Sequence, residues 1–326
     1  MAWPNNTRLF WTDLGSKARV TGGGLQTWDI PRVGILSGIY MVIKGTVSST
    51  VTGPNAFGMA SIVSNLSVVA NSGLQIVSIS GQGYHYLLRD MLEHFVDVGF
   101  DTTARNVVSD ATFDISMWIP IAINSHDPLG LINLQNQDTL LQIQLNWAAE
   151  SVVATGGPTI AAMAEPYLEL FSMPLDPHDM PAFNYAHTIT EEQETVSGAG
   201  VYTKNWLRNN IYVQMIHGAG FAQSGSDSWT TLALRVDQNR FLIPSCPPRF
   251  FDLWYDRYHG RARLAGVIPI DFAGTSGLGN YNSIRDAIDT SQLTDIATLL
   301  NASGAITLYS VKRQLVRLSP PAQAGT

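Results

Sequence analysis

The feature that most constrains the fold is a short segment that occurs twice. Trp118-Ile119-Pro120-Ile121 returns as Val267-Ile268-Pro269-Ile270, at an offset of 267 − 118 = 149 positions. A similar turn follows each copy, Pro128-Leu129-Gly130 after the first and Gly277-Leu278-Gly279 after the second. A chain of 326 residues that repeats itself near half its length is expected to hold two copies of one fold.

The stretch 113–147 predicts two strands joined by a loop. Apolar residues alternate through 113–123 and again through 141–147, where Gln and Asn occupy the positions between them. A period of two is typical of strands with one face on a core. Asp127-Pro128-Leu129-Gly130 is the turn signal between the two strands.

Further short segments predict strands in the same way. They lie at 33–47, 62–69, 74–79, 167–171, 211–215, 232–236 and 306–318. Helical spacing occurs only in connections, at 84–95, at 247–258 and around Leu293, Ile296, Leu299 and Leu300. Ser245 is expected to cap the helix at 247–258. Many short strands with few helices predict an all-β chain of two tandem eight-stranded jelly-roll β-sandwiches, with short helices in the connecting loops.

Prolines and glycines suggest where the domains divide. Pro174, Pro177 and Pro181 cannot lie inside a sheet, so 173–181 is the expected linker. The expected organisation is an N-terminal arm at 1–32, a first jelly roll at 33–172, the linker, a second jelly roll at 182–318 and a C-terminal tail at 319–326. The arm is expected to be irregular, with aromatic residues that dock on the parent domain or on a neighbour: Trp3, Phe10, Trp11 and Trp28.

Composition excludes several functional classes. Charged residues make up only 14% of the chain, against about 25% in typical proteins; this suits β-rich proteins whose faces are covered by neighbours. The net charge of −7 argues against electrostatic coating of nucleic acid. The single cysteine, Cys246, cannot form an intramolecular disulfide. The first residues lack the apolar segment of a signal peptide, so synthesis in the cytoplasm is expected.

No constellation of residues indicates an enzyme, a cofactor or a metal. The seven histidines include no pair at the spacing of a zinc protease, and Gly274-Thr275-Ser276-Gly277 is not a nucleophile elbow. Two further groups contain side chains that could bind a metal or act in catalysis. Asp176-Pro177-His178-Asp179 is assigned to the linker, and His126-Asp127 is assigned to a turn. The acidic cluster of Glu191, Glu192 and Glu194 predicts a solvated loop. Basic residues are densest at Arg257, Arg261 and Arg263, and next at Lys312, Arg313 and Arg317. Salt bridges across subunit edges are the expected role of these arginines.

The order of these elements resembles a known family. The segment TFDISMWIPIAINSHDPLGLINLQNQDTLLQIQLNW, the proline-rich linker and the second strand–helix–VIPI unit are similar to the double jelly-roll major capsid proteins of the tectivirus and adenovirus-hexon lineage. The resemblance covers about residues 33–318. It implies a major capsid protein that forms homotrimers. Two jelly rolls in each of three chains would give pseudo-hexagonal capsomers that tile an icosahedral shell.

The resemblance also implies partners and a location. These are neighbouring capsomers, penton and minor capsid proteins, and an internal viral membrane reached through the N-terminal arm. Sequence-specific binding of nucleic acid is not expected. The protein is expected in the virion of a bacteriophage, after synthesis in the host cytoplasm.

The aromatic helix at 247–258 has two interpretations. It packs against its own sandwich, or it contacts another subunit, since Trp, Tyr and Arg dominate protein interfaces. Both can hold for different faces. The candidate interface residues are Phe250, Trp254, Tyr255, Arg257, Tyr258 and Arg261.

Two rival functions remain open at the level of sequence. A tandem jelly-roll carbohydrate- or receptor-binding spike protein would stack Trp229 or Trp206 on a sugar. A β-sandwich glycoside hydrolase would need two carboxylates about 5–10 Å apart in a cleft, and no pattern in the chain indicates such a pair.

Overall fold

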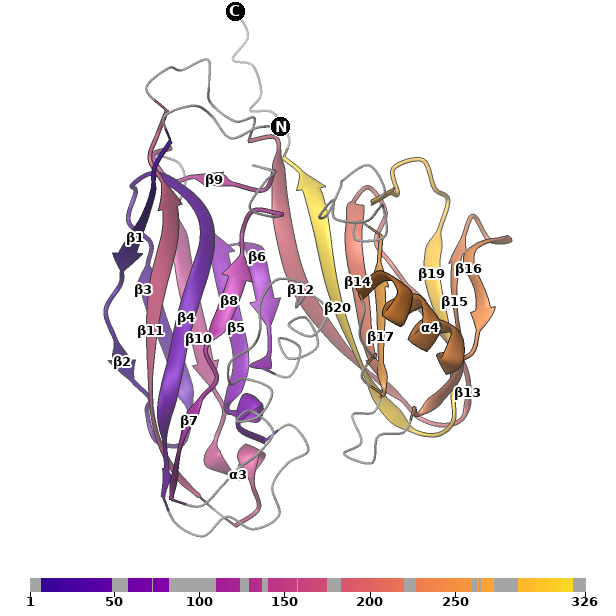
Figure 1. The fold of residues 1–326 in the computed structure, drawn as a ribbon, viewed down its shortest axis with the longest axis horizontal. Coiled ribbons are helices and arrows are strands. Elements are labelled where there is room, and N and C mark those ends of the chain that lie inside the picture. Colours follow the sequence, from indigo (N-terminus) through magenta and orange to yellow (C-terminus); the bar gives the residue numbers. More distant parts are fainter. Residues whose placement is uncertain are drawn as a thin grey trace, which may run out of the picture. The chain divides into compact units, whose positions relative to one another are not determined.

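The computed structural model describes residues 7–48, 58–71, 73–81, 110–123, 129–136, 140–156, 158–174, 183–219, 227–259, 263, 265–272 and 287–318. They form two compact units (Figure 1). The first unit holds the described residues up to Ile189 together with Val316 to Leu318, and the second holds those from Thr190 to Leu315.

The first unit is a sandwich of two antiparallel sheets. One sheet has the order β1-β11-β4-β7, with β8 and β9 also paired to β4 and β2 paired to β11; the other has the order β3-β10-β5-β6. The strands are β1 (Leu9–Asp13), β2 (Lys17–Ala18), β3 (Gly24–Asp29), β4 (Ile35–Ser48), β5 (Val63–Ala70), β6 (Leu74–Ile79), β7 (Ala111–Asp114), β8 (Met117–Pro120), β9 (Ile132–Asn133), β10 (Leu141–Trp147) and β11 (Thr159–Phe171), with two short helical turns, η1 (Gly58–Ile62) and α3 (Glu150–Val153).

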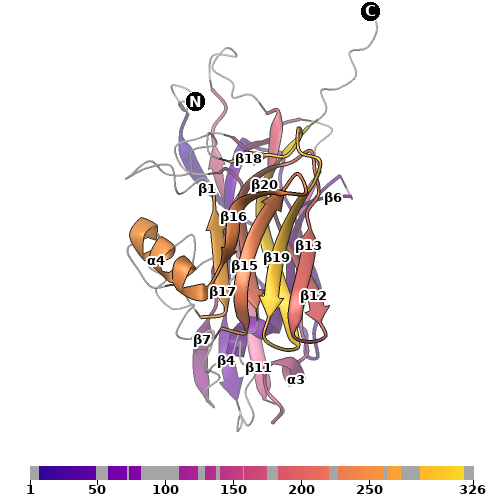
Figure 2. The same cartoon turned by 90° about the vertical axis from the view of Figure 1, so that its right-hand side faces the viewer.

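The second unit repeats this architecture. One sheet has the order β12-β20-β14-β17, with β18 also paired to β14; the other has the order β13-β19-β15-β16, which Figure 2 shows face-on. The elements, of which β12 begins and β20 ends among residues counted with the first unit, are β12 (Tyr185–Val196), β13 (Gly200–Asn205), β14 (Ile211–Ala219), β15 (Trp229–Val236), β16 (Arg240–Cys246), α4 (Pro248–His259), β17 (Val267–Asp271), β18 (Ile288–Asp289), β19 (Ile296–Ala302) and β20 (Ile306–Arg317).

The two sandwiches share one strand order. We count the strands of each unit along the chain, taking β7 and β8 as one interrupted strand and leaving out the two-residue strands β2, β9 and β18. One sheet then reads first, eighth, third, sixth and the other reads second, seventh, fourth, fifth. This alternation between sheets is the jelly-roll topology. The repeated segments occupy equivalent places: β8 pairs with β4 through Ile119 and Ile39, and β17 pairs with β14 through Ile268 and His217. The predicted all-β duplication is therefore confirmed.

The alternating residues of 113–123 form part of the core of the first sandwich. The six predicted core residues are all buried: Phe113, Ile115, Met117, Ile119, Ile121 and Ile123. The predicted single strand is nevertheless split into β7 and β8. At the break, the Ser116 hydroxyl donates to Asp114 Oδ1 and accepts a hydrogen bond from the Ile43 backbone N–H. The side chain of Ser116 thus substitutes for a regular ladder bond.

The prediction of an irregular arm at 1–32 is wrong for residues 9–29. β1 and β3 are the first and second strands of the first sandwich, and β1 pairs with β11 from Leu9↔Phe171 to Asp13↔Tyr167. Trp28 is buried, and its indole N–H donates to the Gly15 carbonyl. The partner strand lies far away in the sequence, so no local pattern around residues 9–13 reveals it.

Two smaller predictions are also wrong, and three strands of the second sandwich were missed. The stretch from Ile296 is strand β19, held between β13 and β15, because pairing on both sides overrides the helical spacing of its leucines. Ser245 lies in β16 and caps nothing, since α4 begins at Pro248. The strands β12, β13 and β16 were not predicted.

Several predictions fall outside the described residues. These are the helix at 84–95, most of the linker at 173–181, the tail at 319–326 and the turn residues Asp127 and Pro128. Among the residues that the structure does describe, no helix is both long and apolar enough to span a membrane.

Gly45 is required by the close approach of β4 to β11. A Cβ atom at this position would lie 2.1 Å from the Ala161 carbonyl oxygen and 2.8 Å from the Ala162 Cα. Replacement of Gly45 by Ala is expected to lower the free energy of unfolding by about 1–3 kcal/mol, because the backbone must shift. Chemical denaturation measures this loss. Gly73→Ala is the matched control, since nothing lies within 4 Å of its added Cβ, and an equal effect of both changes would contradict the prediction.

Candidate functional site

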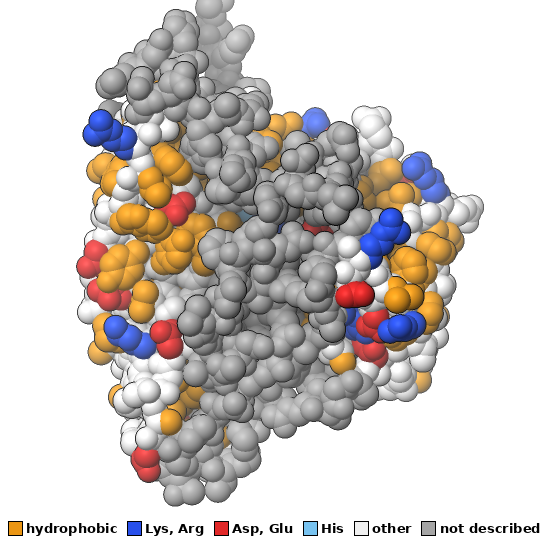
Figure 3. Space-filling view, in the orientation of Figure 1, with side chains coloured by type: hydrophobic (Ala, Val, Ile, Leu, Met, Phe, Trp, Pro, Cys, Tyr) orange, Lys and Arg blue, Asp and Glu red, His pale blue; other side chains and the backbone are white. Residues whose placement is uncertain are grey.

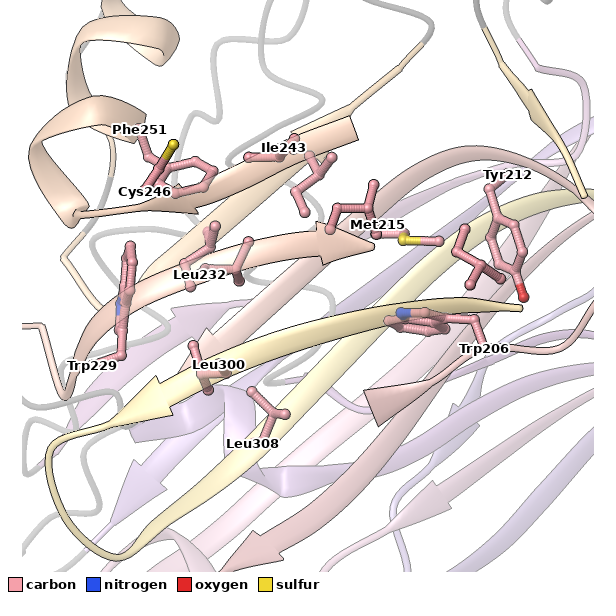
Figure 4. Close-up of a cluster of buried hydrophobic side chains, with 14 of the residues drawn as sticks. Trp206, Tyr212, Met215, Trp229, Leu232, Ile243, Cys246, Phe251, Leu300 and Leu308 are labelled. Carbon is pink, nitrogen blue, oxygen red and sulfur yellow. The ribbon is translucent and has the colours of Figure 1, made fainter. Parts of the chain in front are cut away.

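Helix α4 carries the predicted interface residues, and its inner face belongs to the core of the second sandwich. Pro248 occupies its first turn, where a missing N–H costs nothing, and the Phe250 N–H donates to the Pro247 carbonyl. Phe251 and Tyr255 are buried. The Phe251 ring meets Trp229 edge-on, with centroids 5.7 Å apart. Figure 4 shows Phe251 beside Cys246, the sole cysteine, which is buried.

The outer face of α4 presents apolar side chains to the surface. Phe250 is 41% exposed and Leu253 is 55% exposed. Arg249 and Arg257 are exposed beside them. Leu253 was missed by the sequence analysis, although it lies one turn from Phe250 and the helical period could have found it.

The six predicted interface residues therefore differ in how exposed they are. Phe250 and Arg257 lie at the surface, and Trp254 is half-buried against Phe250 and Phe251. Tyr255 packs inward and cannot serve as a contact. The Tyr258 side chain and Arg261 lie outside the described residues, and the interface itself stays a prediction.

Arg263 fixes α4 to the sandwich. Its guanidinium makes a two-pronged pair with the Asp227 carboxylate at 2.9 and 2.8 Å, and its Nε donates to Asp252 of α4 at 3.0 Å. It also lies over the Trp229 ring, 5.6 Å from the centroid. Arg263 was predicted to lie at a subunit edge, but its side chain is buried and paired within its own chain. Asp227 lies 36 positions away, so no local signal points to it.

Asp227 and Arg263 each stabilise the charged form of the other. Burial alone would raise the pKa of the Asp227 carboxyl, but hydrogen bonds from Arg263 and from the Gly266 backbone N–H outweigh it, so this pKa lies below its usual value. Burial alone would likewise lower the pKa of Arg263, which the two aspartates raise instead. The ion pair is thus the charged state throughout the neutral range.

A second polar cluster lies on β12, β13 and β20. Lys204 pairs with Glu192 and Glu194, and Lys312 pairs with Glu192. Both lysines are buried. The prediction that these glutamates form a solvated loop is wrong, because they lie in strand β12 beside cations contributed by two other strands. Burial raises the pKa of Glu192, but the two lysines outweigh it and lower the net value.

His217 lies next to this cluster and is fully buried. One ring nitrogen lies 3.2 Å from the Ser310 hydroxyl and the other lies 3.2 Å from the Thr298 hydroxyl. Burial, with a smaller effect from the Lys204 charge, lowers the pKa of His217 to about 3. The imidazole is therefore neutral in the folded protein.

The structure removes the basis of the sugar-stacking alternative. Trp206 is 6% exposed and Trp229 is 2% exposed. The Trp206 indole N–H donates to Thr298, and both rings lie inside the core shown in Figure 4. Neither side chain can stack on a bound sugar.

No metal centre is formed by the part of the chain that the structure describes, where no group of three or more His, Cys, Asp or Glu side chains comes together. The candidate groups at 176–179 and 126–127 lie outside that part, so they are not tested.

Comparison with known proteins gives matches in structure only. No protein-family model and no curated protein sequence matches the chain. The crystal structure of the STIV MCP matches with a TM-score of 0.72 at 14% identity, over 98% of this chain and 100% of that one. The chain has the double jelly-roll fold of viral major capsid proteins.

Two further matches extend the comparison. The major capsid protein P2 from bacteriophage PM2 matches with a TM-score of 0.60 at 10% identity, over 98% of this chain and 100% of that one. The PBCV-1 virus capsid matches with a TM-score of 0.62 at 11% identity, over 97% and 96%. The double jelly-roll fold thus spans nearly the whole chain, including the strands in residues 9–29 that the sequence analysis left out.

Replacement of Arg263 by Lys is expected to lower the free energy of unfolding by about 3 kcal/mol, because an ammonium cannot reproduce the two-pronged bond and leaves the partly buried Asp227 carboxylate incompletely paired. Denaturant unfolding of the purified protein measures the loss. Arg208→Lys is the matched control, because Arg208 makes one long hydrogen bond, to the Leu293 carbonyl, at an exposed position. A loss below about 0.5 kcal/mol for Arg263→Lys would contradict the assigned role.

His217 makes the stability of the protein depend on pH. Its folded pKa of about 3 lies below the ordinary 6.5, so the unfolded chain binds an extra proton between these values. The contribution of the neutral His217 to the free energy of unfolding is complete above pH 6.5 and is lost as the pH falls toward 3. From pH 7 to pH 5 the loss is expected to be about 2 kcal/mol.

The measurement compares His217→Gln, whose amide can still bond to Ser310 and Thr298, with the unchanged protein. The expected result is a flatter dependence of unfolding free energy on pH from 7 to 5. Glu192 and Asp227, whose pKa values are lowered, lose their contributions only at lower pH. Identical slopes in the two proteins would rule out a neutral buried His217.

Proposed function

We propose that the chain is a major capsid protein that forms homotrimers, and that these trimers are pseudo-hexagonal capsomers of an icosahedral virion. One observation carries the proposal: a single chain holds the same jelly-roll strand order twice, and solved viral capsid proteins match it over nearly its whole length. The role is structural and involves no catalysis.

The duplication supports this role through symmetry. Three chains with two similar sandwiches each give a ring with six similar edges, although only a threefold axis relates the chains. Such a ring closes because its subunit contacts are heterologous, with one surface meeting a different surface on the next chain. A hexagonal lattice is then covered by one gene product.

The low charge of the chain fits the same role. Charged residues form 14% of the sequence, and the exposed side chains include large apolar ones on both units: Leu9, Trp11, Leu25, Leu74, Phe241, Leu242, Phe250 and Leu253. Contiguous exposed apolar surface marks sites of association. A protein that spends its life packed among copies of itself can present such surface.

The proposed partners are neighbouring capsomers, with penton and minor capsid proteins at special positions of the shell. The contact with an internal membrane that was expected of an arm at 1–32 is not proposed for residues 9–29, because these form strands of the sandwich. A bacteriophage as the source stays a prediction from resemblance. The carbohydrate-binding alternative is not carried forward, since both of its candidate tryptophans are buried.

The purified protein is expected to have the mass of three chains of 35.5 kDa. Native mass spectrometry or light scattering tests this directly, and negative-stain microscopy should show particles with a pseudo-hexagonal outline. A control at decreasing concentration separates a stable trimer from weak association. A stable monomer that forms no larger assembly at any concentration would contradict the proposed capsomer.

A further inference from the structure

The outer sheet face of the first sandwich carries an aromatic surface. Trp11 from β1, Tyr40 from β4 and Trp118 from β8 form a continuous row, with ring centroids 5.0 Å apart for Trp11–Tyr40 and 4.1 Å apart for Tyr40–Trp118. With Leu9 we call this row the aromatic plate. Figure 3 shows hydrophobic side chains gathered over β1, β11 and β4.

The plate is built into the sheet. A Cβ atom on Gly38 would lie 1.8 Å from the Trp118 ring, so the absence of a side chain at Gly38 allows the indole to lie flat on the strand. Trp11 is nevertheless 48% exposed and Leu9 is half-exposed. Aromatic side chains positioned this way, but left open to water on the outer face of a sandwich, are typical of a contact surface.

Acidic groups surround the plate. Asp13 on β1 is exposed, and Glu165 and Glu169 lie partly exposed on β11. Burial raises the pKa of Glu169, opposed by a hydrogen bond from the Ser37 hydroxyl. Exposed basic residues lie near it as well: Lys44 is further along β4, and Arg8 directly precedes Leu9. The described part of the plate is thus apolar at its centre, with three carboxylates beside it that a cationic partner surface can meet.

The outer face of α4 has the opposite charge. Phe250 and Leu253 are its apolar centre, and exposed Arg249 and Arg257 flank them, against one exposed acid, Asp256. Residues 249, 253 and 257 recur at intervals of four, so they lie along one side of the helix. We call Arg249, Phe250, Leu253 and Arg257 the α4 surface.

We propose that the aromatic plate of one chain receives the α4 surface of a second copy of the same chain. Apolar centres of similar character would be buried together, and arginines would meet the carboxylates of Asp13 and Glu165. Trp, Tyr and Arg are the residues that supply most binding energy at interfaces, and charge complementarity fixes their orientation. The inference rests on the proposed capsomer and names the two surfaces that join its subunits.

The geometry disfavours a sugar as the occupant of the plate. The Trp11 and Tyr40 rings are inclined at 62°, and the Tyr40 and Trp118 rings at 37°. A run of linked sugar rings stacks best on aromatic faces that share one plane, which these angles do not offer. A protein surface with protruding side chains such as Phe250 and Leu253 fits an uneven plate better.

The two surfaces differ, so the contact is heterologous, and this allows a sharp test. Trp11→Arg blocks the plate and leaves the α4 surface intact; Leu253→Arg does the reverse. Each variant alone is expected to have the mass of one chain. When the two are mixed, the intact α4 surface of the first can still bind the intact plate of the second. The mixture is therefore expected to form a species of two chains that cannot close into a ring.

Controls separate specific effects from misfolding. Val152→Arg in the first unit and Leu207→Arg in the second place the same charge at exposed apolar positions outside both surfaces, and they should remain trimers. Circular dichroism and thermal unfolding check that each variant folds. Trp11→Ala, which adds no charge, is expected to raise the dissociation constant of the trimer by about tenfold or more.

The outcomes distinguish this inference from the proposed function. A monomeric wild-type protein would overturn both. A trimeric wild type with trimeric Trp11→Arg and Leu253→Arg variants would overturn the pairing of surfaces alone. Monomeric variants that fail to combine on mixing would show that the surfaces do not meet each other. Trp11-dependent binding of the intact trimer on a glycan array would show that the plate is open in the assembly, which the proposal forbids.

Discussion

The eighth strand of each sandwich lies between the first and the third, and the rest of the fold depends on this pairing. β11 pairs with β4 from Thr159↔Ser48 to Phe171↔Ile35, and with β1 along its other edge. β20 pairs with β14 from Ile211↔Leu315 to Ala219↔Leu308. Ser48 and Thr159 are 111 positions apart, so neither sandwich closes until its last strand is in place. Topologies of such high contact order fold slowly and expose unpaired edges meanwhile.

The same dependence on distant partners explains what could be predicted from the sequence. Strand β10 was found with its observed ends, because Leu141, Ile143, Leu145 and Trp147 alternate on one buried face. The repeated Ile-Pro-Ile segment revealed the duplication, since it occupies the sixth strand in both copies. β1 was missed because its five residues are too few to show a clear alternation of apolar and polar side chains. Its partner β11 also lies far along the chain.

The functional surfaces were harder to predict than the fold. The aromatic spacing of α4 located the helix and one exposed residue, Phe250, but it did not show that Tyr255 points inward. The pairs of Arg263 with Asp227 and of Lys312 with Glu192 join residues from separate strands and connections. The sequence does not show whether a charged side chain is solvated or paired with a buried partner. Only the packing in the folded structure distinguishes these two cases.

The buried charges of the second sandwich restrict how it can pack. Lys204 and Lys312 are both buried and share Glu192, so a shift of β13 or β20 along its neighbour would leave an ammonium without its carboxylate. Such a loss costs several kcal/mol, whereas a slipped apolar pair costs much less. Two sandwiches that share one strand order therefore differ in what fixes their register and in what they expose. That difference gives one chain two unlike surfaces, which is the condition for a heterologous contact that closes a ring.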